Sequence, residues 1–147
     1  MTGPNLAVGD YKVIDLIEEC GAAIVAEEFC EGVRHYWESV EETSGDLLSA
    51  LGRRYLTRRV PCAFQMPSVK VRVDFIKNLA QEFKVDGVIW YQLKNCETYN
   101  AEAFYANKKL KEAGIPFLKI ESEYDPGERG GLGTRIETFV ETMERRY

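Results

Sequence analysis

The order of hydrophobic and polar residues along the chain alternates between two patterns. Stretches in which hydrophobic residues recur every three or four positions are typical of amphipathic helices, and short continuous hydrophobic runs are typical of buried parallel strands. The clearest run is residues 88–93, with the sequence Val-Ile-Trp-Tyr-Gln-Leu. The pattern predicts strands over residues 22–29, 88–93 and 116–121, and helices over residues 10–20, 33–42, 46–56, 68–83, 98–113 and 132–145.

Small polar residues and proline mark the ends of several of these elements. Asp46 or Ser44 precedes one predicted helix and Ser68 precedes another, and each is a residue type that caps helix amino-termini. Pro61 favours extended backbone around residues 59–64, which fits a short edge strand or a loop equally well.

Strands that alternate with helices of this length indicate βαβ units. The sequence therefore predicts an α/β fold with an open, doubly wound, mostly parallel sheet and helices on both faces, of the Rossmann or flavodoxin-like kind. Without internal repeats or a linker, residues 1–147 are expected to form a single α/β domain. Residues 1–5 have the composition of a loop that leaves a strand, although no strand precedes them. Either the chain is a piece of a longer polypeptide or these residues form a flexible terminus.

Composition and charge exclude several classes of protein. The 147 residues carry a formal net charge of −5, whereas binding to nucleic acid phosphates requires a clustered basic surface. No hydrophobic run approaches the roughly 18 residues of a membrane span, and no signal peptide begins the chain. We expect a cytoplasmic protein that contacts neither nucleic acid nor membrane.

The four cysteines are candidates for metal binding or for simple packing. A reducing compartment disfavours disulfides, and no Cys-x-x-Cys pair suggests a zinc site. Cys30 directly follows a predicted strand, Cys96 lies three residues beyond another, and Cys62 lies in the extended segment. Ligands bind beyond the carboxyl ends of parallel strands, and iron–sulfur clusters accept thiolates scattered over the sequence. Cys20 lies on a predicted helix, where packing is the simpler role.

Other candidate groups have less support. His35 is the only histidine, so nucleophilic catalysis would depend on one residue of a predicted helix, and a surface or packing role is preferred. The glycine-rich residues 130–133 begin a predicted helix but lack phosphate-binding Gly-x-Gly-x-x-Gly spacing. Two glutamate pairs at strand ends resemble acid–base pairs, although solvated surface acids are the commoner explanation: Glu27 with Glu28, and Glu121 with Glu123.

Residues 87–99, Gly-Val-Ile-Trp-Tyr-Gln-Leu-Lys-Asn-Cys-Glu-Thr-Tyr, resemble the carboxyl-terminal region of a known family. It is the 2-hydroxyacyl-CoA dehydratase D-component family, which includes 2-hydroxyglutaryl-CoA dehydratase subunits and the related ATP-dependent benzoyl-CoA reductase subunits. Further matching segments follow the same order and cover nearly the whole chain: residues 28–34 with Tyr36 and Trp37, residues 113–125, and residues 134–140.

The resemblance implies a cluster-ligating domain at the carboxyl end of a longer subunit. Cys96 matches the cysteine that this domain contributes to a [4Fe-4S] cluster, whose other ligands lie outside this chain. Cys30 and Cys62 are further candidate metal ligands from their positions alone, and the resemblance assigns Cys30 no such role. The family's partners are a second subunit, an ATP-dependent activator protein and an acyl-CoA substrate. The parent enzyme would be a lyase or an oxidoreductase of anaerobic metabolism, and the isolated domain would be inactive.

Two alternatives belong to other functional classes. One is a double-cubane-type reductase of small molecules that does not use CoA. The other is a non-catalytic α/β binding module without a cluster, which would bind no iron and keep four inert thiols. A zinc-binding protein fits the cysteine spacing least well.

Overall fold

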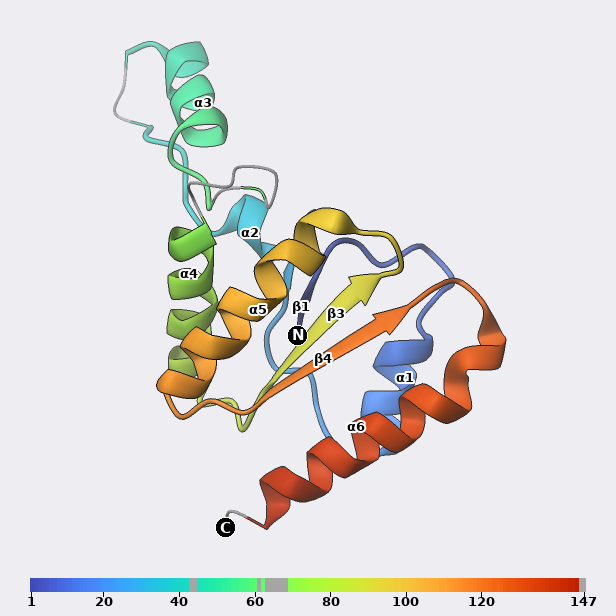
Figure 1. Cartoon of the computed structure of the whole chain (residues 1–147). Helices are drawn as coiled ribbons and strands as arrows, with labels where there is room; N and C mark the ends of the chain where they lie inside the picture. Colours follow the sequence, from blue (N-terminus) through green and yellow to red (C-terminus); the bar gives the residue numbers. More distant parts are fainter. Residues whose placement is uncertain (43–44, 61, 63–68, 146–147) are drawn as a thin grey trace.

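A four-stranded parallel sheet forms the centre of the molecule (Figure 1). The computed structural model describes residues 1–42, 45–60, 62 and 69–145. The strands are β1 (Thr2–Gly3), β2 (Glu28–Phe29), β3 (Val88–Leu93) and β4 (Phe117–Ser122), in the order β2-β1-β3-β4. Each neighbouring pair is parallel, with Thr2 opposite both Glu28 and Trp90. The predicted α/β fold with a parallel sheet is confirmed.

Helices cover both faces of this sheet. Helices α1 (Lys12–Glu19) and α6 (Arg129–Glu144) pack on one face, and α4 (Val69–Glu82) and α5 (Glu97–Glu112) pack on the other. Strand β3 explains this arrangement, because Val88 and Trp90 join the cluster under α4 and α5 while Ile89 and Tyr91 join the cluster under α1 and α6. Successive residues of a strand point to opposite faces, so a strand covered on both sides is hydrophobic throughout.

Strand β1 corrects the prediction that residues 1–5 form a loop. Thr2 and Gly3 lie between β2 and β3 and are both buried. The amide of Cys30 donates to the carbonyl of Pro4 over 2.6 Å, which extends the contact between β1 and the chain after β2. A strand of two residues is too short to show a hydrophobic pattern, so the sequence analysis did not predict it.

Two predicted elements are shorter than expected. Only Glu28 and Phe29 of the predicted strand 22–29 form a ladder, because the neighbouring strand β1 offers only two residues. The predicted helix 33–42 contains only α2 (Val33–Tyr36). The guanidinium of buried Arg54 donates to the carbonyls of His35 and Glu38, so a side chain satisfies these carbonyls where the helix has ended.

The remaining helices agree closely with the sequence pattern. Helix α3 (Leu47–Leu56) is capped by Asp46, whose Oδ1 accepts a hydrogen bond from the Ser49 amide over 3.2 Å. After the 3₁₀ turn η2 (Pro126–Glu128), α6 begins three residues before its predicted start. The glycine-rich residues 130–133 therefore lie inside α6. The predicted cap Ser68, the alternative cap Ser44 and half of segment 59–64 (residues 61, 63 and 64) fall outside the described residues.

Gly3 is required by the close packing around β1. A Cβ atom at this position would lie 2.9 Å from side-chain carbons of both Phe29 and Tyr91, and 3.0 Å from the Tyr91 carbonyl oxygen. We expect Gly3→Ala to lower the free energy of unfolding by about 1–3 kcal/mol, measured by urea denaturation. Gly130→Ala is the control, since nothing described lies within 4 Å of a Cβ there. Equal effects of the two substitutions would contradict this view of β1.

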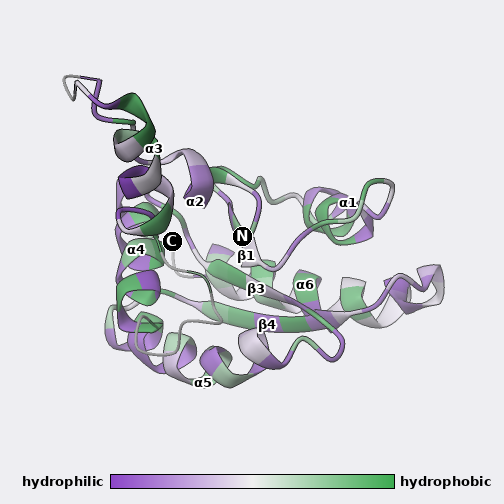
Figure 2. Cartoon of the chain, turned by 90° about the horizontal axis from the view of Figure 1, so that it is seen from above, coloured by the Kyte–Doolittle hydropathy of each residue, from purple (hydrophilic) through white to green (hydrophobic). Residues whose placement is uncertain are grey.

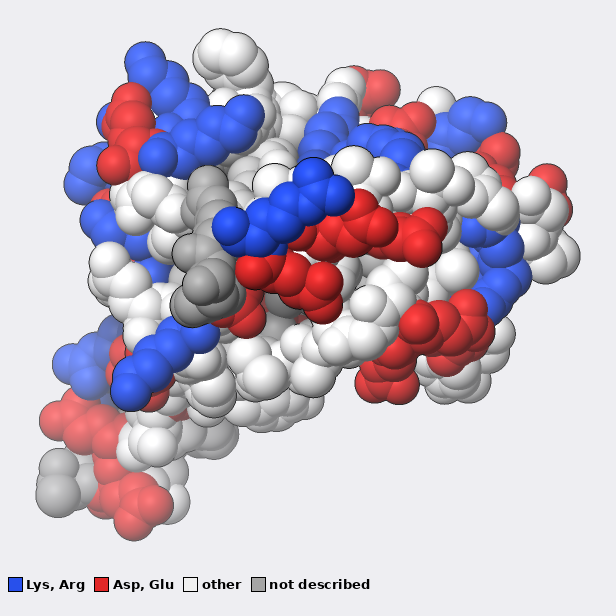
Figure 3. Space-filling view, turned by 90° about the horizontal axis from the view of Figure 1, so that it is seen from below, with Lys and Arg blue, Asp and Glu red and all other residues white. Residues whose placement is uncertain are grey.

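Acidic and basic side chains are mixed on the surface. Figure 3 shows both signs of charge interspersed over one face of the molecule. None of the described helices combines the length and the hydrophobicity needed to cross a membrane.

Candidate functional site

The strand order reverses between β1 and β3, which are neighbours in the sheet. From β1 the chain continues to α1 on one face of the sheet, and from β3 it continues to α5 on the opposite face. In open parallel sheets, such a reversal of direction is where ligands bind. The loop after β1 brings Asn5 to this edge, and its buried Oδ1 has no hydrogen-bond partner among the described residues.

Cys96 lies at this edge, at the amino-terminal cap of α5. Its amide donates to the Leu93 carbonyl over 3.0 Å, and its carbonyl accepts from the Asn100 amide over 3.0 Å. The half-buried thiol has its Sγ 3.6 Å from Thr98 Oγ1 and packs against the core cluster under α4 and α5. Asn95 enters the left-handed region with φ of 65°, which turns the chain from strand to helix. The predicted place of Cys96 just beyond a strand is confirmed.

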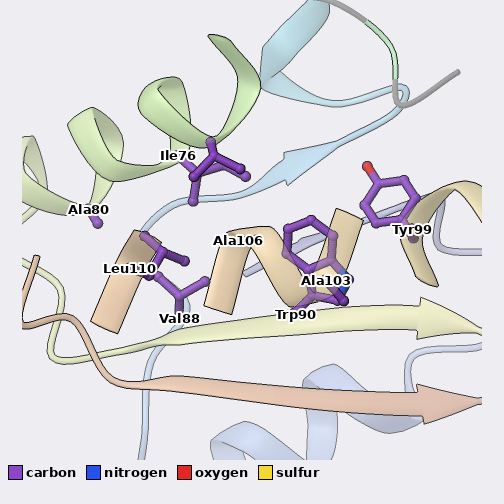
Figure 4. Packing of buried hydrophobic residues seen from close by; sticks show 9 residues of the cluster. Ile76, Ala80, Val88, Trp90, Tyr99, Ala103, Ala106 and Leu110 are labelled. Atoms are coloured by element: carbon purple, nitrogen blue, oxygen red, sulfur yellow. The ribbon is translucent and has the colours of Figure 1, made fainter. Parts of the chain in front are cut away.

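Cys30 packs against the same core cluster as Cys96. Its Sγ lies 3.6 Å from the hydroxyl oxygen of Tyr99, which lies in the first turn of α5. Figure 4 shows Tyr99 above the carboxyl-terminal part of β3, with Trp90 nearer the middle of the strand. The centroids of these two rings are 5.3 Å apart. Burial raises the pKa of Tyr99, so its hydroxyl stays protonated and can donate to sulfur.

Cys30 and Cys62 line one small pocket. It has a volume of about 80 Å³ and is completed by Arg34, His35, Arg59 and Val60. The structure thus brings these two predicted site residues together, on the α2 side of the sheet edge. No group of three His, Cys, Asp or Glu side chains able to hold a metal ion exists among the described residues.

Cys20 lies apart from the other thiols. It packs against the cluster between the sheet and helices α1 and α6, on the opposite face from Cys30 and Cys96. Desolvation raises the pKa of its thiol, and the nearby acids Glu137 and Glu19 add to this effect. Both observations agree with the packing role predicted for Cys20.

Two buried ion pairs support the site, and the sequence analysis predicted neither of them. Arg34 Nη1 lies 3.0 Å from Glu28 Oε1, and Glu28 Oε2 also accepts a hydrogen bond from the Thr2 hydroxyl over 2.5 Å. Burial raises the pKa of Glu28, while the Arg34 guanidinium opposes this shift. Glu27 accepts hydrogen bonds from the amides of Phe29 and Val33. The interpretation of Glu27 and Glu28 as solvated surface acids is therefore wrong.

The second ion pair joins α4 to α5. Arg72 contacts Glu102, both side chains are 1% exposed, and the guanidinium lies 4.6 Å from the Tyr99 ring centroid and 5.5 Å from that of Trp90. A sequence signal for this pair exists. Arg72 falls at helical spacing among the core-facing Val69, Val73 and Ile76, so it is a charge within a hydrophobic stripe.

Comparisons with known proteins show the family to which the chain belongs. Residues 1–143 match the family model of the 2-hydroxyglutaryl-CoA dehydratase D-component. A protein of Escherichia coli (strain K12) named dehydratase subunit YjiM is 31% identical over 144 residues, which cover 97% of this chain and 37% of that protein. The (R)-phenyllactyl-CoA dehydratase beta subunit of Clostridium sporogenes is 27% identical over 131 residues, covering 89% of this chain and 34% of that protein.

The chain thus spans about a third of the length of the curated relatives it matches. The matched region nevertheless includes all four strands and the sheet edge that carries Cys96 and Cys30. The chain belongs to the 2-hydroxyglutaryl-CoA dehydratase D-component family.

Proposed function

We propose that this chain is the cluster-ligating part of a 2-hydroxyacyl-CoA dehydratase, with Cys96 as one thiolate ligand of a [4Fe-4S] cluster. The observation that supports this role best is the position of Cys96. It lies at the carboxyl edge of the sheet, just beyond β3, where the strand order reverses between β1 and β3, in a member of a dehydratase family. A thiol in that place can reach a group shared with other polypeptide segments.

The residues at this edge of the sheet fit the role of supplying one ligand to the cluster rather than a complete set of ligands. Thiolates are the preferred ligands of iron–sulfur clusters, and the amino-terminal end of α5 favours negative charge next to Cys96. The other thiolate ligands of the cluster would come from outside this chain, as the family resemblance implies. When bound, such a cluster supplies single electrons at low potential.

The other residues at this edge of the sheet would hold Cys96 in place and exclude water from the site. Backbone hydrogen bonds on both sides fix the position of Cys96, and the core cluster around Trp90 and Tyr99 shields one side of its thiol from water. The buried pair of Arg72 and Glu102 braces α4 against α5 behind that cluster. A rigid and desolvated support of this kind tunes the potential of a metal group.

The substrate and the partners are proposed from the names of the relatives. One of them is named as a phenyllactyl-CoA dehydratase beta subunit, so we propose an acyl-CoA substrate and a second subunit that completes the enzyme. An ATP-dependent activator protein would deliver the electron. Elimination of a hydroxyl group, as the names of both relatives imply, is preferred over ring reduction of the benzoyl-CoA type.

Iron content tests the role of Cys96. The tagged chain would be isolated anaerobically from its native cells with its associated subunits, as wild type, Cys96→Ser and Cys20→Ser. We expect Cys96→Ser to lose most of the iron and the thiolate-to-iron absorption, because a ligand is removed. Cys20→Ser should retain both, since Cys20 packs on the opposite face. Full iron content in Cys96→Ser would overturn the proposal.

A further inference from the structure

The ladder of β1 stops short of the first residues of β3. Strand β3 begins at Val88, whereas Thr2 of β1 pairs with Trp90, so β1 starts level with the middle of β3 (Figure 1). Val88 and Ile89 have ladder partners on β4 but none on β1. On the other side of β1, residues 22–26 form a hydrophobic run that predicts a buried strand, yet they belong to no ladder in the described part of the chain. Two strand-like segments thus flank a space that β1 does not reach.

A cavity lies at this place on each face of the sheet. The larger one, of about 390 Å³, is lined by residues 22–26, by Ile89 and by hydrophobic side chains of α1 and α6. The smaller one, of about 30 Å³, is lined by Val88 and by hydrophobic side chains of α4. Met1 and Ala26 line both cavities. Figure 2 shows hydrophobic residues along β3, which lies between the helices of the two faces. Both cavities therefore offer hydrophobic walls beside Met1.

The alternation of side chains along β1 decides which way further side chains would point. Thr2 lies opposite Trp90, whose ring belongs to the cluster under α4 and α5, and Met1 packs against the cluster under α1 and α6. Because successive residues of a strand point to opposite faces, a residue joined before Met1 would point to α4 and the smaller cavity. The next residue outward would point to α1, α6 and the larger cavity. The two cavities thus match the side chains of a strand that continues β1.

The amino group of Met1 is buried in surroundings that suit a peptide bond. Its nitrogen donates to the Ala26 carbonyl over 2.8 Å, as the amide of a parallel strand would. Burial lowers the pKa of this amino group to about 6, although the nearby acids Glu27 and Glu28 oppose the shift. A buried ammonium loses its hydration, whereas a peptide N–H would keep the hydrogen bond without a charge. The surroundings of this nitrogen therefore favour a neutral amide.

We propose that a hydrophobic segment joined to Met1 extends β1 by about three residues and completes the sheet between residues 22–26 and β3. Its backbone would pair with both neighbours, and its side chains would enter the two cavities. The residue beside Met1 is expected to be small, because the cavity on the α4 side is small, and the next residue outward is expected to be larger. The curated relatives are long enough to contain such a segment, since this chain covers 37% and 34% of them. An interior strand of the sheet would then anchor this domain to the rest of its subunit.

Extension of the purified chain before Met1 tests this proposal. One version carries Val-Ile-Ala before Met1, and its matched control carries Val-Asp-Ala, so that only the residue facing the larger cavity differs. We expect Val-Ile-Ala to raise the urea midpoint above that of the unextended chain, because it buries hydrophobic surface. Val-Asp-Ala should not raise the midpoint, because its carboxylate would enter a hydrophobic cavity. Equal midpoints for the two extended versions would overturn the proposal.

Hydrogen exchange of the Ile89 amide, measured by NMR, locates the added segment. The amide of Val88 donates to the Pro116 carbonyl next to β4 over 2.8 Å, so the amide of Ile89 points away from β4 and toward the cavities. We expect Val-Ile-Ala to slow the exchange of this amide at least about tenfold. Unchanged exchange would contradict a strand at this place. So would a small hydrophobic molecule found in the unextended chain by native mass spectrometry.

The completed sheet does not depend on the proposed cluster. The Cys96→Ser variant of the extended chain should therefore show the same rise in urea midpoint and the same protection of the Ile89 amide. Loss of iron binding and failure of the extension to stabilise the sheet are thus separate results.

Discussion

Glu102→Gln is expected to lower the free energy of unfolding by about 3–5 kcal/mol. The substitution keeps the size of the side chain but removes the charge that pairs with Arg72. The guanidinium is 1% exposed, and its Nε and Nη1 have no hydrogen-bond partner among the described residues. Without Glu102, an uncompensated charge would stay buried between α4 and α5. Urea denaturation followed by circular dichroism gives the free energy directly.

The same helix provides the control for this experiment. Glu112 pairs with Lys109 over 2.7 Å at an exposed site near the end of α5. Exposed pairs contribute less than about 1 kcal/mol, so Glu112→Gln should change stability little. Replacing both Arg72 and Glu102 by hydrophobic residues of similar size should recover at least half of the loss. If Glu102→Gln is no more destabilising than Glu112→Gln, the buried pair does not brace these helices.

Trp90→Ala is expected to lower the free energy of unfolding by about 3–5 kcal/mol, because it leaves a cavity in the centre of the molecule. Trp90 is fully buried, and its ring contacts Tyr99 on α5 and Phe117 on β4. It also lies beneath the Arg72 guanidinium. The variant should therefore loosen the contact between β3 and α5, on which the position of Cys96 depends.

Trp90→Phe separates the ring packing from the indole nitrogen. Trp90 Nε1 is buried without a hydrogen-bond partner among the described residues, so its removal costs no hydrogen bond. We expect Trp90→Phe to lower the free energy of unfolding by less than half as much as Trp90→Ala does in the same urea experiment. A loss as large as that of Trp90→Ala would mean that the nitrogen binds a group essential to the fold.

The long elements of the fold were predictable because their patterns are strong. Strand β3 has the predicted bounds, and α5 differs by one residue at each end, since a fully buried strand and a long amphipathic helix are unambiguous in sequence. Strand β1 was not predictable, because Thr2 and Gly3 have no periodicity of their own. The shortness of β2 follows from β1 and was missed for the same reason.

The candidate site was predictable in part. A cysteine just past a hydrophobic run must lie at the carboxyl edge of a parallel sheet, so the place of Cys96 followed from β3 alone. The shared pocket of Cys30 and Cys62 depends on how the chain returns after α3, which no local pattern records. Arg72 and Glu102 were missed because charged residues are expected on the solvent side of a helix, and only their spacing within core-facing stripes indicates otherwise.

Protection of the thiols from alkylation tests the central claim most directly. The native assembly would be treated anaerobically with iodoacetamide before and after removal of iron by a chelator, and the modification of each cysteine would be measured by peptide mass spectrometry. Cys96 is predicted to be protected while iron is bound and to react fully after its removal, whereas the reactivity of Cys20 should stay the same. Equal labelling of Cys96 in both states would contradict its role as a cluster ligand.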